Sequence, residues 1–443
     1  MNFNDLQNLY TANRDRLSAT KNYLNRVRVT STNFVSSAIK GYSEERKADL
    51  ILIPNNFEGE IVDNRNNWAF AKGFSIDSKD EKDDEFLKDF ATNKDLNVIA
   101  KRTGWNTLAT GQSIITCYSD KDNEVNFYVP KPEMCVYLED NYGNISQFAF
   151  FYFKQEIDGY RLYCDAFDDN EITFFQSTTT QTNNTLETLP SMSIVDTKPH
   201  YFSQAPAIVL DMEYPAFFQV LPLIDAYNKL LTETNDQFSA FKAVILALKN
   251  LLMTDDANEA IIGDDETKSK QAYDKVQKMS VLFLGEDGEA NYLTREVQVD
   301  AFNTLEKILS DNIDRFSGNV NYEDPEVLGK ATNLTVNARM KQVGNKAQDL
   351  TDLFQMQFRK LLKIINDFWK VQGKGIDLTQ IYFSFRYDRP VDKPLEAQLV
   401  QNLINAGVQP KDAYREYSSF SNPEEVAKAT EEALGGMNDT ENY

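Results

Sequence analysis

The stretch VLPLIDAYNKLLTETNDQFSAFKAVILAL occupies residues 220–248 and decides how the chain is organised. Its apolar side chains recur at steps of three and four residues, the spacing of one face of an α-helix. Pro222 fits the first turn, where the missing N–H of proline costs no hydrogen bond. We therefore predict a helix over residues 219–248, about 45 Å long. The apolar positions are Val220, Leu223, Ile224, Tyr227, Leu230, Leu231, Phe238, Phe241, Ile245 and Leu248.

An acidic insert and a second helix follow. The insert, residues 249–298, carries acidic turns, a short helix predicted over 268–278 and a hairpin whose turn contains Asp287-Gly288, a pair typical of two-residue turns. Helical spacing then predicts a returning helix that ends at Gly318, a residue type favoured just after a helix C-terminus. We expect the two helices to pack antiparallel. The apolar positions of the second are Phe302, Leu305, Ile308, Leu309, Ile313 and Phe316.

An irregular loop over residues 318–330 precedes a third, longer helix. The apolar positions of that helix run from Leu334 to Phe368 and predict about 35–40 helical residues, stopped by Gly373 and Gly375. Residues 380–388 alternate in polarity and predict a strand, which needs a partner in the earlier sheet because an isolated strand is not stable. Residues 391–443 are predicted as small helices.

Residues 45–215 have a different texture, with short alternating runs separated by turn signals. They predict a mixed domain with a mainly antiparallel sheet, two helical patches at 83–90 and 96–107, and a final buried strand at 204–210. Before this domain, residues 1–44 form a helical segment whose stretch 3–28 is locally basic. That basic face is either solvated or a docking face for an acidic neighbour.

The composition describes a folded and strongly acidic protein. The 443 residues include 46 basic and 68 acidic side chains, a net charge of -22, together with 29 Phe and 21 Tyr. Such a surface repels phosphate, so ordinary nucleic-acid capture is disfavoured, whereas contact that lets DNA slide is not. We expect no signal peptide and no membrane span. Cys117, Cys135 and Cys164 fit neither a disulfide framework nor a zinc site, which favours synthesis in a reducing cytoplasm.

The motifs of catalysis are missing from the sequence. His200 is the single histidine, which nearly removes mechanisms that need an imidazole. Gly329-Lys330-Ala331-Thr332 lacks the earlier glycine of a phosphate-binding loop, so we expect no ATP hydrolysis. The acidic clusters lack the spacing of a calcium loop and are predicted as solvated turns. We expect no enzyme, no metal and no cofactor, although paired carboxylates of a hydrolase remain open because their pairing is spatial.

This order of elements resembles the portal proteins of long-tailed double-stranded DNA bacteriophages. Residues 199–209 (PHYFSQAPAIV) are similar to the family's strand leading into the stem, and residues 220–229 (VLPLIDAYNK) to the start of its first stem helix. Residues 383–390 and 399–408, with 422–425, are similar to its closing strand and crown. The resemblance covers roughly residues 45–435 and implies an α+β fold with an α/β wing, a long-helix stem, a small α/β clip and a helical crown.

The resemblance also implies where these parts lie. The stem would be 216–248 with 299–317, the clip 249–298, the tunnel loop 318–330, the wing 45–215 with 331–390, including a long helix over 331–372, and the crown 391–443. The tunnel-loop residues that would meet DNA are Gly318, Asn319, Val320, Asn321, Tyr322, Glu323, Asp324 and Lys330. Lys229, Lys242, Lys307 and Arg315 of the stem would contact phosphates or, equally, form salt bridges between subunits. The clip would dock partners through Asp255, Asp256, Asp264, Asp265, Glu286, Asp287 and Glu289.

The implied function is a ring at one capsid vertex, usually of twelve subunits, that serves DNA packaging and ejection. Its implied partners are other copies of the chain, double-stranded DNA, the terminase large subunit, a head–tail adaptor, and the major capsid and scaffolding proteins, with no membrane. The implied location is the virion. A structural assembly protein without a channel, such as a capsid or baseplate component, is the alternative for an acidic chain poor in catalytic motifs.

Overall fold

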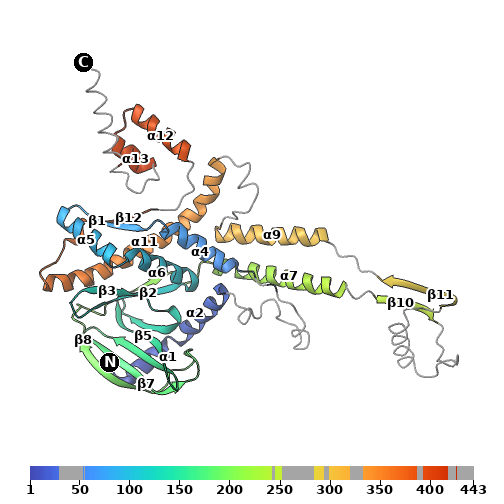
Figure 1. Cartoon of the computed structure of the whole chain (residues 1–443), viewed down its shortest axis with the longest axis horizontal. Coiled ribbons are helices and arrows are strands. Elements are labelled where there is room, and N and C mark those ends of the chain that lie inside the picture. The colour runs from blue at the N-terminus through green and yellow to red at the C-terminus, as the bar shows by residue number, and fades with distance from the viewer. Residues whose placement is uncertain are drawn as a thin grey trace. The chain divides into compact units, whose positions relative to one another are not determined.

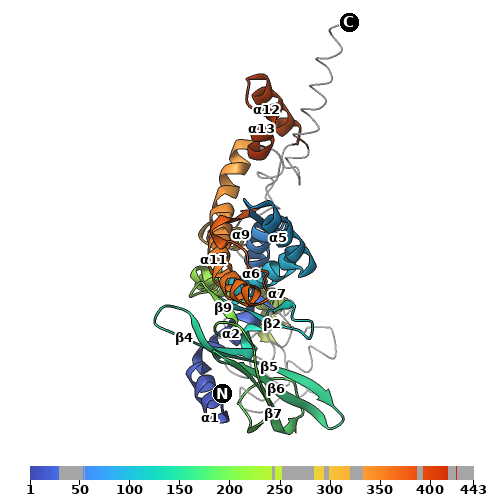
Figure 2. The same cartoon turned by 90° about the vertical axis from the view of Figure 1, so that its left-hand side faces the viewer.

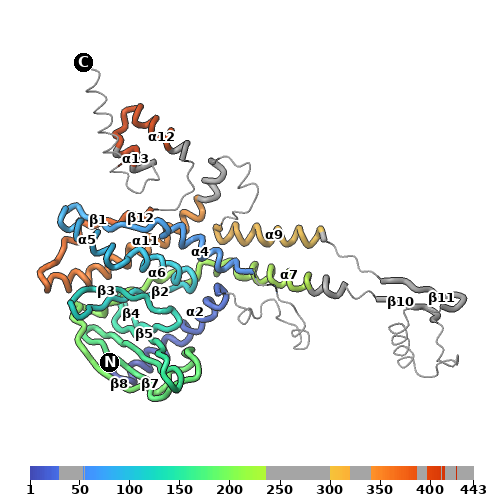
Figure 3. The backbone as a smooth tube through the Cα atoms, viewed as in Figure 1, coloured from blue at the N-terminus to red at the C-terminus, as the bar shows by residue number. Residues whose placement is uncertain are grey.

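The structure is a computed structural model that describes the backbone of residues 1–28, 53, 55–241, 245–251, 284–293, 299–319, 333–386, 393–417 and 426 (Figure 1). Side chains are described for the same residues except 236–299, 333–340, 393–396, 411 and 415–417. The chain divides into two units. The first contains Met1–Asn33, Asn56–Val220 and Asp314–Tyr443, and the second contains Phe34–Asn55 and Leu221–Ile313. Figure 3 traces the backbone, with the undescribed parts in grey.

Antiparallel sheets form the middle of the first unit, as the alternating runs predicted. Five strands pair in the order β4-β5-β6-β7-β8 and three more in the order β3-β2-β9. The buried strand predicted at 204–210 is confirmed by β9, which pairs with β2, and β2 also pairs with β3. The strand bounds are β2 Gln112–Ser119, β3 Val125–Tyr128, β4 Cys135–Glu139, β5 Ile145–Glu156, β6 Gly159–Phe167, β7 Glu171–Gln181, β8 Met192–Pro199 and β9 Ala207–Asp211.

Two helices begin the chain: α1 (Phe3–Ala12) lies along one face of the five-stranded sheet, and α2 (Arg14–Val27) continues from it to pack against residues 57–70 and 96–110 (Figure 2). Leu6, Leu9 and Leu17 enter a core with side chains such as Phe151 and Phe175. Part of the basic face of α2 binds acidic neighbours within the chain, because Arg26 pairs with Glu58 at 2.9 Å and Arg28 pairs with Glu133 at 3.7 Å. The basic stretch 3–28 thus forms a pair of helices docked within the first unit, partly through ion pairs of its own chain.

Three helices precede these strands in the chain, α4 (Phe57–Phe70), α5 (Glu81–Asn93) and α6 (Leu96–Thr110), and α6 packs on β2. The last two confirm the predicted patches at 83–90 and 96–107. The first was not predicted. The short 3-10 turns η1 (Pro132–Met134), η2 (Phe218–Val220) and η3 (Leu378–Gln380) connect neighbouring elements.

The long helix α11 (Asn333–Val371) confirms the longest helix predicted from periodicity, with 39 residues. Its buried side chains follow the helical repeat from Val343 to Phe368. The strand predicted after it is β12 (Ile381–Phe385), which pairs antiparallel with β1 (Phe74–Ser78) in a separate two-stranded sheet and not with the meander. Phe354 of α11 lies 5.3 Å from Phe74 of β1 and 6.3 Å from Phe385 of β12, ring centre to ring centre, so aromatic packing fixes this pair of strands on the helix. Helices α12 (Lys393–Asn405) and α13 (Pro410–Tyr417) follow.

The second unit corrects two predictions. Helix α7 spans Leu221–Phe241 and does not continue to 248, because residues 245–251 form strand β10 (Ile245–Leu251). The predicted hairpin turn at Asp287-Gly288 is also wrong, because strand β11 (Leu284–Leu293) runs through it and pairs antiparallel with β10. The Asp-Gly pair instead falls in an irregularity of that ladder, between the pairs Lys249–Glu289 and Leu251–Leu284. Helix α9 (Val299–Ser317) returns as predicted.

Gly104 allows α4 and α6 to cross closely, and it gives the first testable prediction. A Cβ atom at this position would lie 2.5 Å from the Phe70 ring and 2.6 Å from Asn66 Oδ1. We expect Gly104→Ala to lower the free energy of unfolding by about 1–2 kcal/mol, because overpacking costs about 1–3 kcal/mol and alanine regains only about 1 kcal/mol of helix propensity. Urea denaturation measures this. Val98→Ala, at a position 63% exposed on the same helix, is the control and should change stability by less than about 0.5 kcal/mol. Equal stability of the Gly104→Ala variant would contradict the close crossing.

Candidate functional site

The two long helices of the second unit carry two of the predicted lysines and are joined by a side-chain hydrogen bond. The Tyr227 hydroxyl of α7 donates a hydrogen bond of 2.7 Å to Glu306 Oε1 of α9. Burial, helped by this acceptor, raises the pKa of Tyr227. Figure 1 shows the two helices running side by side in opposite directions, as predicted. Lys229 and Lys307 are both exposed and lie in sequence beside the two contacting residues.

The two lysines differ in their surroundings. Lys229 lies 3.8 Å from Glu233 on its own helix, a pair at i,i+4 with both side chains about half exposed. Such an exposed pair contributes at most about 0.5 kcal/mol, so Lys229 can exchange this partner for another anion. Lys307 has no carboxylate partner among the described residues. Arg315, further along α9, is exposed and lies 5.7 Å from the ring of Phe316.

The end of α9 is the best-defined part of the candidate site. Gly318 has φ +73°, the left-handed conformation expected just after a helix. The backbone N–H of Asn319 then donates to the Asp314 carbonyl at 3.0 Å. The Asn319 side chain donates to Glu60 Oε1 at 3.1 Å and accepts from Asn64 Nδ2 at 2.9 Å. Asn319 is therefore held by two residues one turn apart on α4.

Arg65, next to Asn64 on α4, holds the last turn of α9. Its guanidinium donates to the Ser317 carbonyl at 2.7 Å, and the residue is only 6% exposed. Burial lowers the pKa of Arg65 to about 10, and the charge of Asp349 opposes that shift. The group is therefore cationic at neutral pH and lies at the negative end of the helix, where a cation is favoured. We refer to Glu60, Asn64, Arg65, Ser317 and Asn319 as the loop anchor.

For the remaining predicted site residues the structure describes either nothing or the backbone alone. Val320, Asn321, Tyr322, Glu323, Asp324 and Lys330 of the loop lie outside them, as do Lys242, Asp255, Asp256, Asp264 and Asp265. Glu286, Asp287 and Glu289 lie on the backbone of β11, whose side chains are not described. Of the predicted loop, the structure thus describes the departure point at Gly318 and Asn319.

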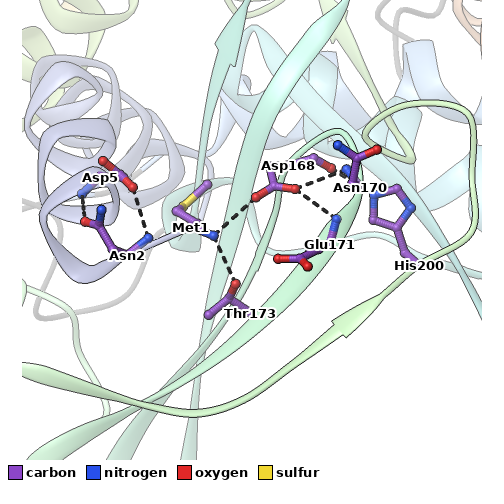
Figure 4. Close-up of polar contacts among 8 residues, drawn as sticks. All are labelled: Met1, Asn2, Asp5, Asp168, Asn170, Glu171, Thr173 and His200. Carbon is purple, nitrogen blue, oxygen red and sulfur yellow. Dashed lines mark hydrogen bonds and ion pairs between the residues drawn. The ribbon is translucent and has the colours of Figure 1, made fainter.

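The single histidine has a structural role, together with the polar cluster around Asp168 (Figure 4). The Phe202 N–H donates to His200 Nδ1 at 3.2 Å, which leaves Nε2 to donate to the Asp168 carbonyl at 2.9 Å. Burial lowers the pKa of His200, so the ring is neutral at pH 7. The Asp168 carboxylate accepts from the backbone N–H groups of Asn170 and Glu171 and from the Met1 amino group at 3.2 Å. Every one of these bonds closes a turn or fixes a terminus.

The described part of the chain shows no metal site, no reactive cysteine and no membrane-spanning helix. No group of three His, Cys, Asp or Glu residues there is placed to hold a metal ion. Burial raises the pKa values of Cys117, Cys135 and Cys164, so these thiols are protonated and unreactive at neutral pH. Among the described helices, none has the length and apolarity needed to cross a membrane.

The loop anchor was missed from the sequence, although its last residue, Asn319, was included in the predicted loop over 318–330. The signal that could have found it is the N-terminal cap of α4, where Asn56 accepts from the Gly59 N–H at 3.1 Å. The polar residues of α4 that bind the loop are otherwise indistinguishable in sequence from solvated ones.

The family model described as "Phage portal protein, SPP1 Gp6-like" matches residues 4–436, which is nearly the whole chain. A comparison with curated proteins found no match.

Proposed function

The chain belongs to the SPP1 Gp6-like family of phage portal proteins, and from this premise we propose how its segments divide the work of a portal. The protein forms the DNA-packaging channel at the capsid vertex and has a role in head–tail connection. The family is structural, and its members act as homo-oligomeric rings that meet DNA and packaging or capsid partners. The proposals below concern which residues of this chain do which of these tasks.

We assign α7 and α9 to the stem, as residues 216–241 with 299–317, and β10 and β11 to the clip, as residues 245–298. The order of elements supports this division, because a small strand pair lies between two helices that run in opposite directions. The clip boundary moves from 249 to 245 because β10 begins at Ile245. The wing is residues 45–215 with 331–390, and the crown is residues 391–443.

One observation carries the assignment of the tunnel loop: the chain leaves α9 at a point that is bonded to α4 on one side and resumes as α11 at Asn333. A loop held at its departure point can project into a channel without moving the helices behind it. Asn319 belongs to the anchor and not to the loop tip. We therefore propose Val320, Asn321, Tyr322, Glu323, Asp324 and Lys330 as the residues that meet DNA in transit.

Charge indicates which residues of the stem and the clip make contacts with partners. Lys307, exposed and without a carboxylate partner among the described residues, is the strongest candidate for a phosphate contact in the stem. Lys229, Lys242 and Arg315 are the others. We propose that the acidic clip residues Asp255, Asp256, Asp264, Asp265, Glu286, Asp287 and Glu289 dock the terminase large subunit during packaging and a head–tail adaptor afterwards. A virion component without a channel has no need of this helix, clip, helix and loop order.

Ring formation tests the proposal, and α9 offers a variant. Leu305 and Ile308 are 45% and 50% exposed, although apolar, so a single subunit leaves them in water. We expect negative-stain images of the purified protein to show rings with a central hole. Leu305→Gln/Ile308→Gln should raise the protein concentration needed for rings about tenfold, with the melting temperature of the monomer unchanged, because these side chains add little to the monomer core. Compact wild-type monomers at all concentrations would overturn the proposed function.

A further inference from the structure

A basic cleft lies on the first unit, over the exposed side of α6. It has a volume of about 740 Å³ and lies between the ends of α4 and α2, the exposed face of α6 and Lys131. Five of the residues that line it are basic and none is acidic. This composition is unexpected in a chain with 68 acidic and 46 basic residues, where carboxylates are abundant enough to pair with every cation.

Three of these cations have no partner within the described part of the chain. Lys101, Arg102 and Lys131 form no ion pair there, and the first two are exposed on α6. A fourth, Arg28, reaches Glu133 at 3.7 Å and lies 5.7 Å from the Trp105 ring. Because Lys101, Arg102 and Lys131 lack counter-ions within the described part of the chain, an anion that enters the cleft gains more there than it would at a paired site.

The cleft combines cations with apolar surface, which suits an amphipathic helix better than a DNA backbone. Val98, Lys101, Arg102 and Trp105 recur at the i, i+3, i+4, i+7 spacing, so they share one face of α6. Val98 is 63% exposed, and Trp105 is fixed by its Nε1 donating to Asp63 at 2.8 Å. A floor of Val98 and Trp105 between cations suits an acidic amphipathic segment, whereas phosphates alone would gain nothing from the apolar surface.

The chain itself carries a matching segment on α5. Glu81, Glu85 and Asp89 are exposed at i, i+4 and i+8, which places three carboxylates along one stripe of the helix. None of the three forms an ion pair in the described part of the chain. Like charges at this spacing destabilise the helix that carries them. A cationic partner outside the subunit would offset that cost.

We propose that the basic cleft of each subunit binds the acidic stripe of α5 from the next subunit. This inference rests on the proposed function, because only an assembly of many copies presents the two surfaces to each other. The cleft and the stripe are different surfaces of the same chain, so their contact is heterologous and repeats around a closed ring. In a protein whose net charge of -22 makes subunits repel one another, such a contact also gives the ring its register.

Charge reversal with rescue tests the inference. Lys101→Glu/Arg102→Glu and Glu81→Lys/Glu85→Lys should each raise the concentration at which rings form at least tenfold, as measured by native mass spectrometry. The combined four-residue variant should recover assembly to within about threefold of wild type. Lys121→Glu/Lys374→Glu, an equal charge change at two exposed lysines away from the cleft, is the matched control and should assemble normally. A Glu85→Cys/Arg102→Cys variant should form disulfides between subunits, because the proposed contact places residue 85 of one subunit beside residue 102 of the next. This readout does not depend on charge repulsion.

Each outcome decides the matter. Wild-type concentrations of assembly in both reversal variants would overturn the inference while leaving the ring intact. Weakened binding of a 30-bp DNA duplex by the cleft variant, with normal assembly, would assign the cleft to DNA and also overturn it. Wild-type protein that forms no ring would overturn the proposed function, and that result is visible before any variant is made.

Discussion

Portal rings in which residues 320–324 are replaced by five alternating Gly and Ser residues should assemble normally and package no DNA. The replacement removes Val320, Asn321, Tyr322, Glu323 and Asp324 but keeps Gly318 and Asn319, so the loop anchor still forms its bonds to Glu60 and Asn64. A flexible linker of the same length spans the same gap but cannot hold a defined surface against the duplex. If the loop tip guides DNA through the channel, packaging should fall at least a hundredfold.

The measurement combines ring imaging with a packaging assay that counts nuclease-protected DNA. The control applies a four-residue linker of the same kind to Thr182–Thr185, an exposed connection between β7 and β8, and it should leave packaging unchanged. Packaging within threefold of wild type by the loop variant would show that the loop tip does not act on DNA. Loss of rings would instead assign these residues to assembly.

The elements predicted correctly are those whose burial follows a single helical face. Helix α11 buries side chains at every turn from Val343 to Phe368, and that periodicity is visible without any structure. Helix α7 was predicted too long because Val244 to Leu248 is a continuous apolar run, which fits a helix face and a buried strand equally. Strand β10 forms there because β11 supplies a partner, and the sequence does not reveal that pairing.

The hairpin turn predicted in the same region was also wrong, because pairing between distant strands outweighed the local turn preference. Asp287-Gly288 is a strong hairpin signal, but β11 pairs with β10 some forty residues earlier, and the pair becomes an irregularity in the ladder. Helix α4 escaped prediction for a different reason. Its buried residues include Glu58, Arg65 and Asn66 among the apolar ones, so no single face is apolar and the helical repeat is hidden.

The candidate site was predicted only where a local rule applied. Gly318 was placed after the helix because a left-handed cap favours glycine, and its φ of +73° agrees. The partners of Asn319 lie more than 250 positions earlier in the chain, at Glu60 and Asn64, and they become neighbours only when α4 meets the end of α9. The same holds for the cleft on α6, since Lys101 and Lys131 belong to different elements.

Arg65→Ala is expected to cause the largest loss of stability of any single change discussed, about 3 kcal/mol. The substitution leaves the Ser317 carbonyl without its charged donor, at a cost of about 1–3 kcal/mol, and adds a cavity under α4 because Arg65 is 6% exposed. Relief of the desolvation that lowers the pKa of Arg65 to about 10 offsets part of this cost. Urea denaturation of the isolated subunit measures the difference, with Arg14→Ala, at an exposed position of α2, as the control.

A second substitution at the same position separates charge from packing. Arg65→Met keeps most of the volume but has no donor, so it should lose about 1–2 kcal/mol, less than the alanine variant. Both variants should also weaken packaging in rings that do form, since the last turn of α9 is no longer fixed to α4 and the loop that follows it loses its fixed departure point. Stability of Arg65→Ala within about 0.5 kcal/mol of wild type would show that the buried guanidinium is not what holds α9 in place, and the position of the tunnel loop would then have to be set by α11 alone.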